Sequence, residues 1–538
     1  MRYDSGMPTR TRYDAVVIGS GHNGLVAAAY LTRAGQSVLV LERNDWLGGA
    51  TASQRVFAGR EAYLSRYAYL ISLLPGVILD ELGLAFETRR RRTASFTAYD
   101  DAQGTARGLV LSNVDASRSE ASMHELTGSH AAWAKYQRLL ALESALAAKV
   151  WPTFLEPLRT RAEMHAMLET AEEREAWDGI VERPLGELLE RHADHDVLRG
   201  LLMTDGKIGV FADAHHASLL QNRCFLYHVV GNGTGEWRVP VGGMRALVNG
   251  LIERGRECGV EYRTEAPATR VHLGGDTHAV TFEHDGREAT VDATRVLVNA
   301  APRAFASLLG APWRPKPTDE GSVIKVNMLL RRLPKVKAAG VTPEEAFAGS
   351  FHIDEGYAQL QRSYETAARG DVPVPAPAEI YCHTLTDDSI LSPELRGQGY
   401  QTLTLFGLDM PYRLFDNVEH DARKARVRDL YLAGLNRICA EPFEDCLARD
   451  ADGNLCLEIK SPQDIEREVG HDLGNIFHDT LTWPFTDDAA EAGTWGVETA
   501  YPRVYRCGSS AVRGGAVSGI PGRNTARRIF EELGRRWA

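Results

Sequence analysis

The sequence YDAVVIGSGHNGLVAAAYLTRAGQSVLVLE occupies residues 13–42 and has the pattern of a βαβ unit. Its apolar residues 15–18 predict a buried strand, the GSGHNG turn that follows contains three glycines, and the next dozen residues are small and helix-forming. A second apolar strand over residues 38–41 ends at an acid, Glu42. Strand, turn, helix, strand and acid in this order predict a parallel α/β sheet with a dinucleotide site at its edge.

Each of the three glycines and the acid Glu42 has a physical role. Gly19 permits the tight turn, and Gly21 allows the backbone to approach a pyrophosphate at the positive end of the helix dipole. Gly24 removes a side chain where the helix must lie against the strand. Glu42 stands where a carboxylate can accept hydrogen bonds from a ribose diol.

The composition excludes several classes of protein. The 538 residues carry a formal net charge of −11 with dispersed basic residues, so a nucleic-acid partner is not expected. Residues 67–84 form the most apolar run of the chain. Because Pro75-Gly76 interrupts this run and Asp80 and Glu81 add two negative charges to it, we expect no transmembrane segment. The first twelve residues lack the apolar stretch of a secretory signal. We expect a cytoplasmic protein; peripheral membrane contact through residues 67–84 and the oligomeric state stay open.

The rest of the chain alternates between helical and strand-rich regions. Residues 115–225 contain few turn signals and predict an inserted run of helices. A Gly242-Gly243 turn predicts a helix that ends near Gly259, and Asp285-Gly286 predicts a hairpin. Residues 503–533 again predict a strand, a glycine-rich loop and a helix. The nucleotide site is therefore expected to be assembled from distant pieces of the chain.

Four consecutive arginines, Arg89 to Arg92, precede the strand-like stretch RTASFTAYD. We interpret them as a solvated strand edge in preference to an anion site.

Further motifs carry a resemblance to a known family. Glu42-Arg43 is followed closely by LGGAT at residues 47–51, and three more stretches match at the expected places: TDGKIGVFADAHHAS with GEWRVPVGGM, GNIFHDTLTWPF, and CGSSAVRGGAVSGIPGRNTAR. The chain is similar to the amine oxidase and phytoene desaturase superfamily, and within it resembles the phytoene-desaturase-like branch. The resemblance spans nearly all of the chain and implies FAD in preference to NAD as the cofactor.

The resemblance also implies where the residues of this chain meet FAD. The implied contacts are Gly19, Gly21 and Gly24 at the pyrophosphate, Glu42 at the adenosine ribose, Arg43 and Ala268 at the adenine, Gly48, Gly49, Ala50 and Thr51 along the ribityl chain and pyrophosphate, Asn299 at the end of the neighbouring strand, Gly508 and Ser509 at the pyrophosphate and ribityl chain, and Gly515, Val517, Ser518 and Gly519 below the isoalloxazine.

The expected fold is α/β, with a discontinuous Rossmann-type FAD-binding domain and a mixed α+β substrate domain that carries the helical insertion. We assign residues 12–95, 236–305 and 496–538 to the FAD-binding domain. Residues 96–235 and 306–495 form the substrate domain.

The resemblance implies an FAD-dependent dehydrogenase, desaturase or oxidase that removes hydride from a C–C or C–N bond of an apolar or heterocyclic small molecule to flavin N5. No second Gly-x-Gly-x-x-Gly is present, so we expect oxygen or a quinone, rather than NADPH, as the redox partner. The alternatives are a flavin-dependent polyene isomerase and a flavin-free protein that binds prenylated partners on the same fold.

Candidate acid and base residues are few. His478, flanked by aromatic residues in a family-like motif, is the candidate catalytic residue, with a hydrogen-bonded structural histidine as the alternative. His228, Trp237, His383 and Tyr412 can also line a pocket, although core or surface positions suit each of them better. The spacing of the cysteines and histidines predicts no metal site.

Overall fold

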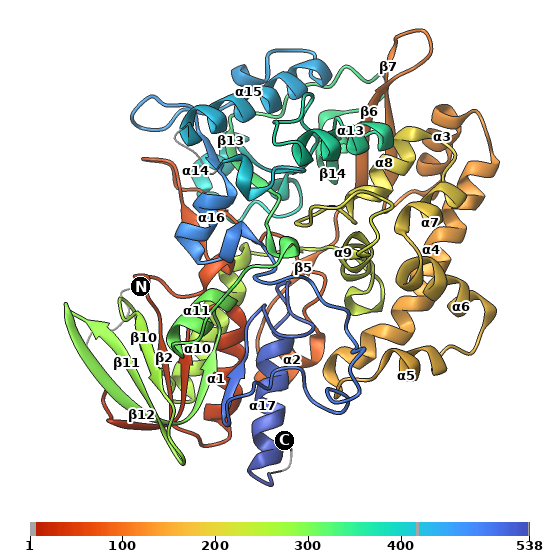
Figure 1. The fold of residues 1–538 in the computed structure, drawn as a ribbon. Helices are drawn as coiled ribbons and strands as arrows, with labels where there is room; N and C mark the ends of the chain where they lie inside the picture. The colour runs from red at the N-terminus through yellow and green to blue at the C-terminus, as the bar shows by residue number, and fades with distance from the viewer. Residues whose placement is uncertain (1–6, 416–418, 536, 538) are drawn as a thin grey trace.

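The structure, a computed structural model, describes residues 7–415, 419–535 and 537. Residues 1–6, which form part of the stretch examined for a signal sequence, lie outside the described residues. Two mixed β-sheets lie at opposite ends of the molecule, and a group of helices lies along one side of both (Figure 1).

The first sheet contains the βαβ unit that begins the chain. Its strands follow the order β10-β11-β12-β1-β2-β9, and β18 pairs with β12. β1, β2, β9, β18 and the second half of β12 run parallel, whereas β10 and β11 form antiparallel pairs. The strands are β1 Arg12–Ile18, β2 Val38–Leu41, β9 Glu261–Arg263, β10 Ala268–His272, β11 His278–His284, β12 Arg287–Val298 and β18 Val504–Arg506.

Helices cover a face of this sheet with small and branched apolar side chains. Ala27, Ala28 and Ala29 of α1 are fully buried, which allows close packing against the neighbouring elements. The covering helices are α1 His22–Arg33, α10 Met244–Glu257 and α17 Ile520–Glu532. This arrangement confirms the prediction of a Rossmann-type α/β fold built from remote segments.

The second sheet follows the order β17-β13-β16-β15-β14-β6-β7. Its strands are β6 Thr93–Asp100, β7 Ala106–Ser112, β13 Ile324–Leu330, β14 Ser350–Ile353, β15 Ala378–Tyr381, β16 Gln401–Gly407 and β17 Leu457–Lys460. Helices α12 Pro343–Phe347, α13 Tyr357–Ala368 and α15 His420–Ile438 lie against it at the top of Figure 1. Ile324, Val326 and Leu405 share a buried apolar core with Tyr431 and Leu435 of α15.

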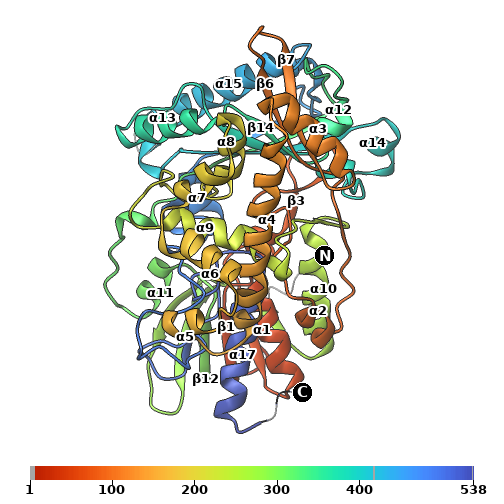
Figure 2. The same ribbon diagram turned by 90° about the vertical axis from the view of Figure 1, so that its right-hand side faces the viewer.

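The helical insertion has its own core. Leu139, Leu142 and Leu146 of α4 are fully buried, as their spacing along a helix requires. Figure 2 shows α4 running between the levels of the two sheets. The helices are α3 Ala116–Thr127, α4 Ala131–Val150, α5 Arg161–Ala166, α6 Ala171–Trp177, α7 Leu185–His192, α8 Asp196–Thr204 and α9 Leu220–Val229.

Two short strand pairs connect these parts: β3 Ser53–Arg55 pairs with β4 Tyr63–Ser65, and β5 Thr88–Arg89 pairs with β8 Val239–Pro240. The other α-helices among the described residues are α2 Gly76–Leu82, α11 Pro302–Leu308, α14 Pro393–Gly397 and α16 Pro462–Val469. β6 begins at Thr93, two residues before the boundary that we place between the domains. None of the described helices combines the length and the apolar character needed to cross a bilayer.

The contact between the insertion and the second sheet gives a test of this packing. A Cβ added to Gly200 of α8 would lie 1.8 Å from the Glu355 carbonyl oxygen, so we expect Gly200→Ala to destabilise the protein by about 1–3 kcal/mol. Gly250→Ala in α10 is the matched control, because its Cβ would meet nothing closer than Leu84 at 3.7 Å, and alanine favours a helix by up to about 1 kcal/mol. Thermal unfolding of both variants measures the difference; equal midpoints would contradict the packing described.

Candidate active site

Three strands from remote parts of the chain end together. Ile18 of β1 pairs with Val298 of β12, and Val298 pairs with Arg506 of β18. The residues that follow these strands therefore meet at the carboxyl edge of the first sheet, where ligands bind in open α/β sheets.

The glycine turn after β1 is held in place by Asn299. The Asn299 side-chain amide donates to the carbonyl oxygens of Gly19 and Gly21, at 3.1 Å each. Gly19 has φ +93°, and a Cβ there would lie 2.6 Å from the Asn299 carbonyl oxygen. α1 begins at His22 without a side-chain cap, so the amides of its first turn are not claimed by a capping side chain. The turn thus offers bare backbone donors of the kind that hold a pyrophosphate.

The acid at the end of β2 is buried next to this turn. Glu42 is 6% exposed, accepts hydrogen bonds from the Ser20 amide and hydroxyl at 3.0 and 2.7 Å, and accepts a third from the Asn44 amide at 2.9 Å. Two carboxylate oxygens offer about four acceptor sites. The group therefore retains capacity to accept a hydrogen bond from a ribose.

A continuous cavity of about 890 Å³ begins at this edge and extends to the second sheet. Most of the residues expected at FAD lie in its wall, as does the candidate catalytic residue His478; the FAD residues are Gly19, Gly21, Glu42, Arg43, Gly49, Ala50, Thr51, Ala268, Asn299, Ser509, Gly515 and Val517. Their contacts with the cofactor stay predictions. The cavity fits a dinucleotide, because it has bare glycines at one end and the acid Glu42 at the end of β2, the strand next to β1.

Five expected cofactor residues do not line the cavity but shape the backbone behind it. A Cβ at Gly24 would lie 2.6 Å from the Gly19 carbonyl oxygen, one at Gly48 2.7 Å from Val248, and one at Gly508 2.6 Å from the Asn299 side chain. The Ser518 hydroxyl accepts from the Ile520 amide at 3.2 Å, and Gly519 has φ +71° at the start of α17. Direct contact with a cavity ligand is therefore not shown for Gly24, Gly48, Gly508, Ser518 and Gly519.

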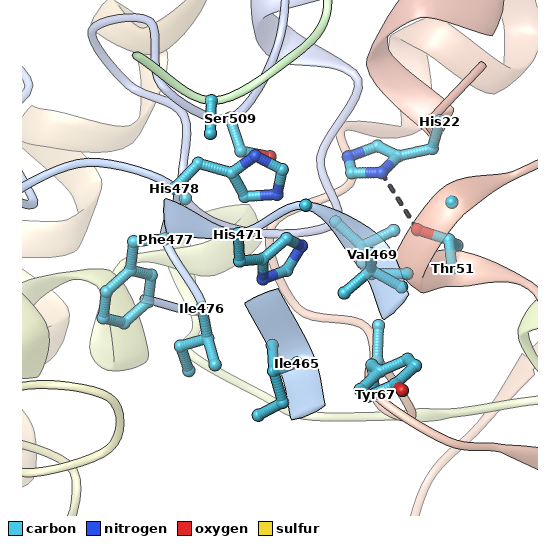
Figure 3. A pocket seen from close by; sticks show the side chains of 18 of the residues that line it. His22, Thr51, Tyr67, Ile465, Val469, His471, Ile476, Phe477, His478 and Ser509 are labelled. Carbon is cyan, nitrogen blue, oxygen red and sulfur yellow. Dashed lines mark hydrogen bonds between the residues drawn. The ribbon is translucent and has the colours of Figure 1, made fainter. Parts of the chain in front are cut away.

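Three imidazoles lie close together in the wall of the cavity: His22 and His471 are buried, and His478 is half-buried (Figure 3). The rings of His471 and His478 lie 3.9 Å apart, centroid to centroid. His22 contacts the Thr51 hydroxyl at 3.0 Å and the Ala516 carbonyl oxygen at 3.1 Å. Burial lowers the pKa of His22 and of His478 to about 4 and the pKa of His471 well below its usual value, so all three rings are neutral near pH 7.

The backbone presents His478 to the cavity at a cost in strain. His478 has φ +69°, in the left-handed region that non-glycine residues rarely adopt. Asn475 holds this turn, because its carbonyl oxygen accepts from the His478 amide at 2.9 Å and its side chain donates to the Asp319 and Asp479 carbonyls. Such strain concentrates at functional sites, which supports His478 as a site residue.

The second sheet supplies a polar floor to the far end of the cavity. Lys325 of β13 and Glu379 of β15 both pair with Phe406 of β16, so the three side chains lie in one row on the same face. All three line the cavity, as does Tyr381, whose hydroxyl donates to the Glu379 carboxyl group. We call Lys325, Phe406, Glu379 and Tyr381 the polar floor.

Burial changes the protonation of this floor. Lys325 is 1% exposed, its ammonium position lies 3.8 Å from the Tyr69 ring centroid, and burial lowers its pKa well below the usual value despite nearby Glu379 and Glu458. Glu379 is 3% exposed, and burial, with the charge of Glu355, raises its pKa to about 8. Burial therefore disfavours the charged form of both the Lys325 amine and the Glu379 carboxyl group.

Several residues of this site were not predicted from the sequence. Lys325 and Asn327 alternate with apolar residues in β13, a pattern that signals a strand with one polar face, whereas nothing local marks Glu379 or His471. His228 and Trp237 line the cavity, but His383 and Tyr412 do not. Arg91 also lines it, so the interpretation of all four arginines as a solvated edge was wrong for Arg91.

Comparison with known proteins agrees with this geometry. The family described as flavin containing amine oxidoreductase matches residues 24–358. The chain is 42% identical to the Mycobacterium tuberculosis uncharacterized protein Rv0897c over 97% of this chain and 98% of the relative. It is 29% identical to the rat pyridine nucleotide-disulfide oxidoreductase domain-containing protein 2 over 97% and 94% of the two chains.

A solved structure shares the fold. Putrescine oxidase bound to putrescine superimposes with a TM-score of 0.55 over 97% of this chain and 99% of that one, at 18% identity. The family match favours an FAD-dependent enzyme over a flavin-free binding protein. The chain belongs to the flavin containing amine oxidoreductase family and is an FAD-dependent oxidoreductase.

Proposed function

We propose that this oxidoreductase oxidises the carbon next to nitrogen in a small polar amine, with oxygen or a quinone as the final electron acceptor. One observation supports this most directly: a continuous cavity joins the glycine turn and Glu42 to the polar floor. Bound FAD supplies a hydride acceptor at flavin N5. A solved structure of the same fold, that of putrescine oxidase, has putrescine, an amine, bound.

The residues proposed to hold FAD follow the length of the cavity. Backbone amides at Gly21 and the first turn of α1 bind the pyrophosphate, and Glu42 accepts from the adenosine ribose. Arg43 and Ala268 border the adenine end; Arg43 also donates to the last carbonyls of α16, at 3.3 and 3.4 Å. Thr51, Ser509 and Gly515 border the flavin end, beside the three neutral imidazoles.

Lys325 has the properties of a proton acceptor for the amine. Most aliphatic amines are protonated at neutral pH, and an ammonium group cannot stabilise the positive charge that develops on its neighbouring carbon during hydride loss. The Lys325 amine, whose uncharged form burial favours, can take the proton from the bound ammonium, which frees the nitrogen lone pair. His478, neutral and also in the cavity wall, can supply one hydrogen bond that orients the bound molecules.

The polar floor also weighs against a polyene as the substrate. A polyene has no hydrogen-bonding group, so its binding would leave Lys325 and Glu379 buried against hydrocarbon. Burying an unsatisfied polar group costs on the order of 1–3 kcal/mol. An amine can instead hydrogen-bond with both groups.

The cofactor part of the proposal is tested by Gly21→Ala. A Cβ at Gly21 would lie 2.9 Å from the Asn299 amide nitrogen, so the methyl group would displace the side chain that holds the turn. We expect the affinity for FAD to fall by about tenfold or more, measured by reconstitution of apoprotein. Gly250→Ala is the control and should reconstitute like the unchanged protein. Equal FAD affinity in Gly21→Ala would contradict the placement of the pyrophosphate.

The role of Lys325 is tested by Lys325→Met. We expect the yellow protein to keep FAD but to lose about 10²–10⁴-fold in kcat/KM for amines. The pH profile should also change. The unchanged enzyme should show a plateau that falls only when Lys325 becomes protonated, whereas activity of the variant should rise about tenfold per pH unit up to the amine's own pKa, because only the free amine then reacts.

The control for this variant is Lys337→Met, since Lys337 is exposed and contacts only the end of α15. It should leave both the rate and the pH profile unchanged. A plateau that persists in Lys325→Met would show that another group accepts the proton.

Substrate class is tested by anaerobic mixing of the yellow protein with putrescine, cyclohexylamine or a carotenoid. We expect loss of the oxidised flavin colour with an amine and no change with the carotenoid. Bleaching by the carotenoid alone would overturn the proposal in favour of C–C desaturation.

A further inference from the structure

Arg91 is a cationic side chain in the cavity wall that the proposed reaction does not use. It lies between β5 and β6, at the edge of the second sheet. Its Nη1 donates to the Ser350 hydroxyl at 3.2 Å, and its guanidinium carbon lies 5.7 Å from the Tyr381 ring centroid. Its Nε is buried and has no hydrogen-bond partner among the described residues. Arg91 therefore reaches the polar floor with an unused donor.

The neighbouring arginines are satisfied differently. Arg89 pairs with Glu87 and Asp387, and Arg90 pairs with Glu236 at 2.8 Å. Arg91 forms no ion pair with any residue that the structure describes. Buried polar atoms normally have a hydrogen-bond partner, and the Nε of the half-buried Arg91 has none among the described residues. The missing partner is therefore expected to come from outside the chain.

The acids nearest to Arg91 do not neutralise it. Tyr381 lies close to both Glu379 and Arg91, because its hydroxyl donates to the Glu379 carboxyl group and its ring lies near the Arg91 guanidinium. Burial raises the Glu379 pKa to about 8, so this acid is protonated at neutral pH. Asp205 lines the same cavity from the end of α8 without forming an ion pair with a described residue. The guanidinium thus presents a positive charge, without an ion-pair partner among the described residues, to the substrate end of the cavity.

We propose that Arg91 binds a carboxylate of the substrate, so that the molecule oxidised here carries both an amino group and a carboxylate. This inference rests on the proposed oxidation of an amine, and it defines the class of amine. The planar guanidinium fork matches the two oxygens of a carboxylate, and a charge-assisted bond of this kind is among the strongest that a side chain makes. The carboxylate end is held at Arg91 while the amino end meets Lys325 and Glu379.

The test uses the FAD-loaded enzyme and matched sets of small molecules. Each set consists of an amino acid, the amine without its carboxylate and the acid without its amine: for example 5-aminopentanoate, butylamine and pentanoate. Sets from 2-aminopentanoate to 6-aminohexanoate vary the separation of the two groups. Binding is measured by calorimetric titration, and oxidation by anaerobic loss of flavin colour.

We expect at least one amino acid to bind about 10- to 100-fold more tightly than its matched amine, the factor that a charge-assisted hydrogen bond supplies. Arg91→Met should abolish this preference and the binding of the simple acid, while the affinity for the amine stays the same. Arg91→Lys should retain part of the preference. The control is Arg92→Met, because Arg92 is adjacent and exposed and does not line the cavity.

The outcomes separate this inference from the proposed function. If the enzyme oxidises amines but no amino acid binds better than its amine, the carboxylate site is wrong and amine oxidation stands. A preference that survives in Arg91→Met would also overturn it. If no amine and no amino acid bleaches the flavin, the proposed function is wrong. If, in addition, no amino acid binds to the enzyme, the carboxylate site is wrong as well.

Discussion

The site depends on the hydrogen bonds that Asn299 makes across the ends of two strands. Its amide holds the carbonyls of Gly19 and Gly21, and its backbone lies where the side chains of Gly19 and Gly508 would have to be. One side chain therefore joins the turn after β1, the end of β12 and the loop after β18. Because these pieces are far apart in sequence, the cofactor cradle exists only when the parallel sheet is fully paired.

At the opposite end of the cavity, side chains rather than backbone amides form the site. Lys325 and Glu379 are placed in one row by the antiparallel register around Phe406, and burial suppresses the charge of both. Groups held away from their usual protonation state can exchange protons with a substrate near neutral pH. Arg91 keeps its charge beside them, since a guanidinium does not lose its proton in proteins. This end of the cavity therefore combines a proton acceptor and a proton donor in the polar floor with a fixed cation at Arg91, whereas the cradle consists of backbone amides.

The sequence predicted the features that are encoded locally. The bounds of β2 and the turn at Asp285-Gly286 agree with the structure, because strand periodicity and turn chemistry act over a few residues. The role of Asn299 was not predictable, since it depends on the register of β12 against β1. Glu379 and Arg91 were missed for the same reason: one lies in a short strand, the other in a run of four arginines, and only the pairing of β6, β14, β15 and β16 brings them to the cavity.

One molecule of FAD is expected to span the cavity from Glu42 to the polar floor. A crystal structure of the yellow protein tests this most directly. We expect density for the adenosine ribose within hydrogen-bond distance of Glu42, the pyrophosphate at the first turn of α1, and the isoalloxazine between His478 and the row of Lys325, Phe406 and Glu379. A dinucleotide in the reverse direction, or an isoalloxazine outside this gap, would contradict the account.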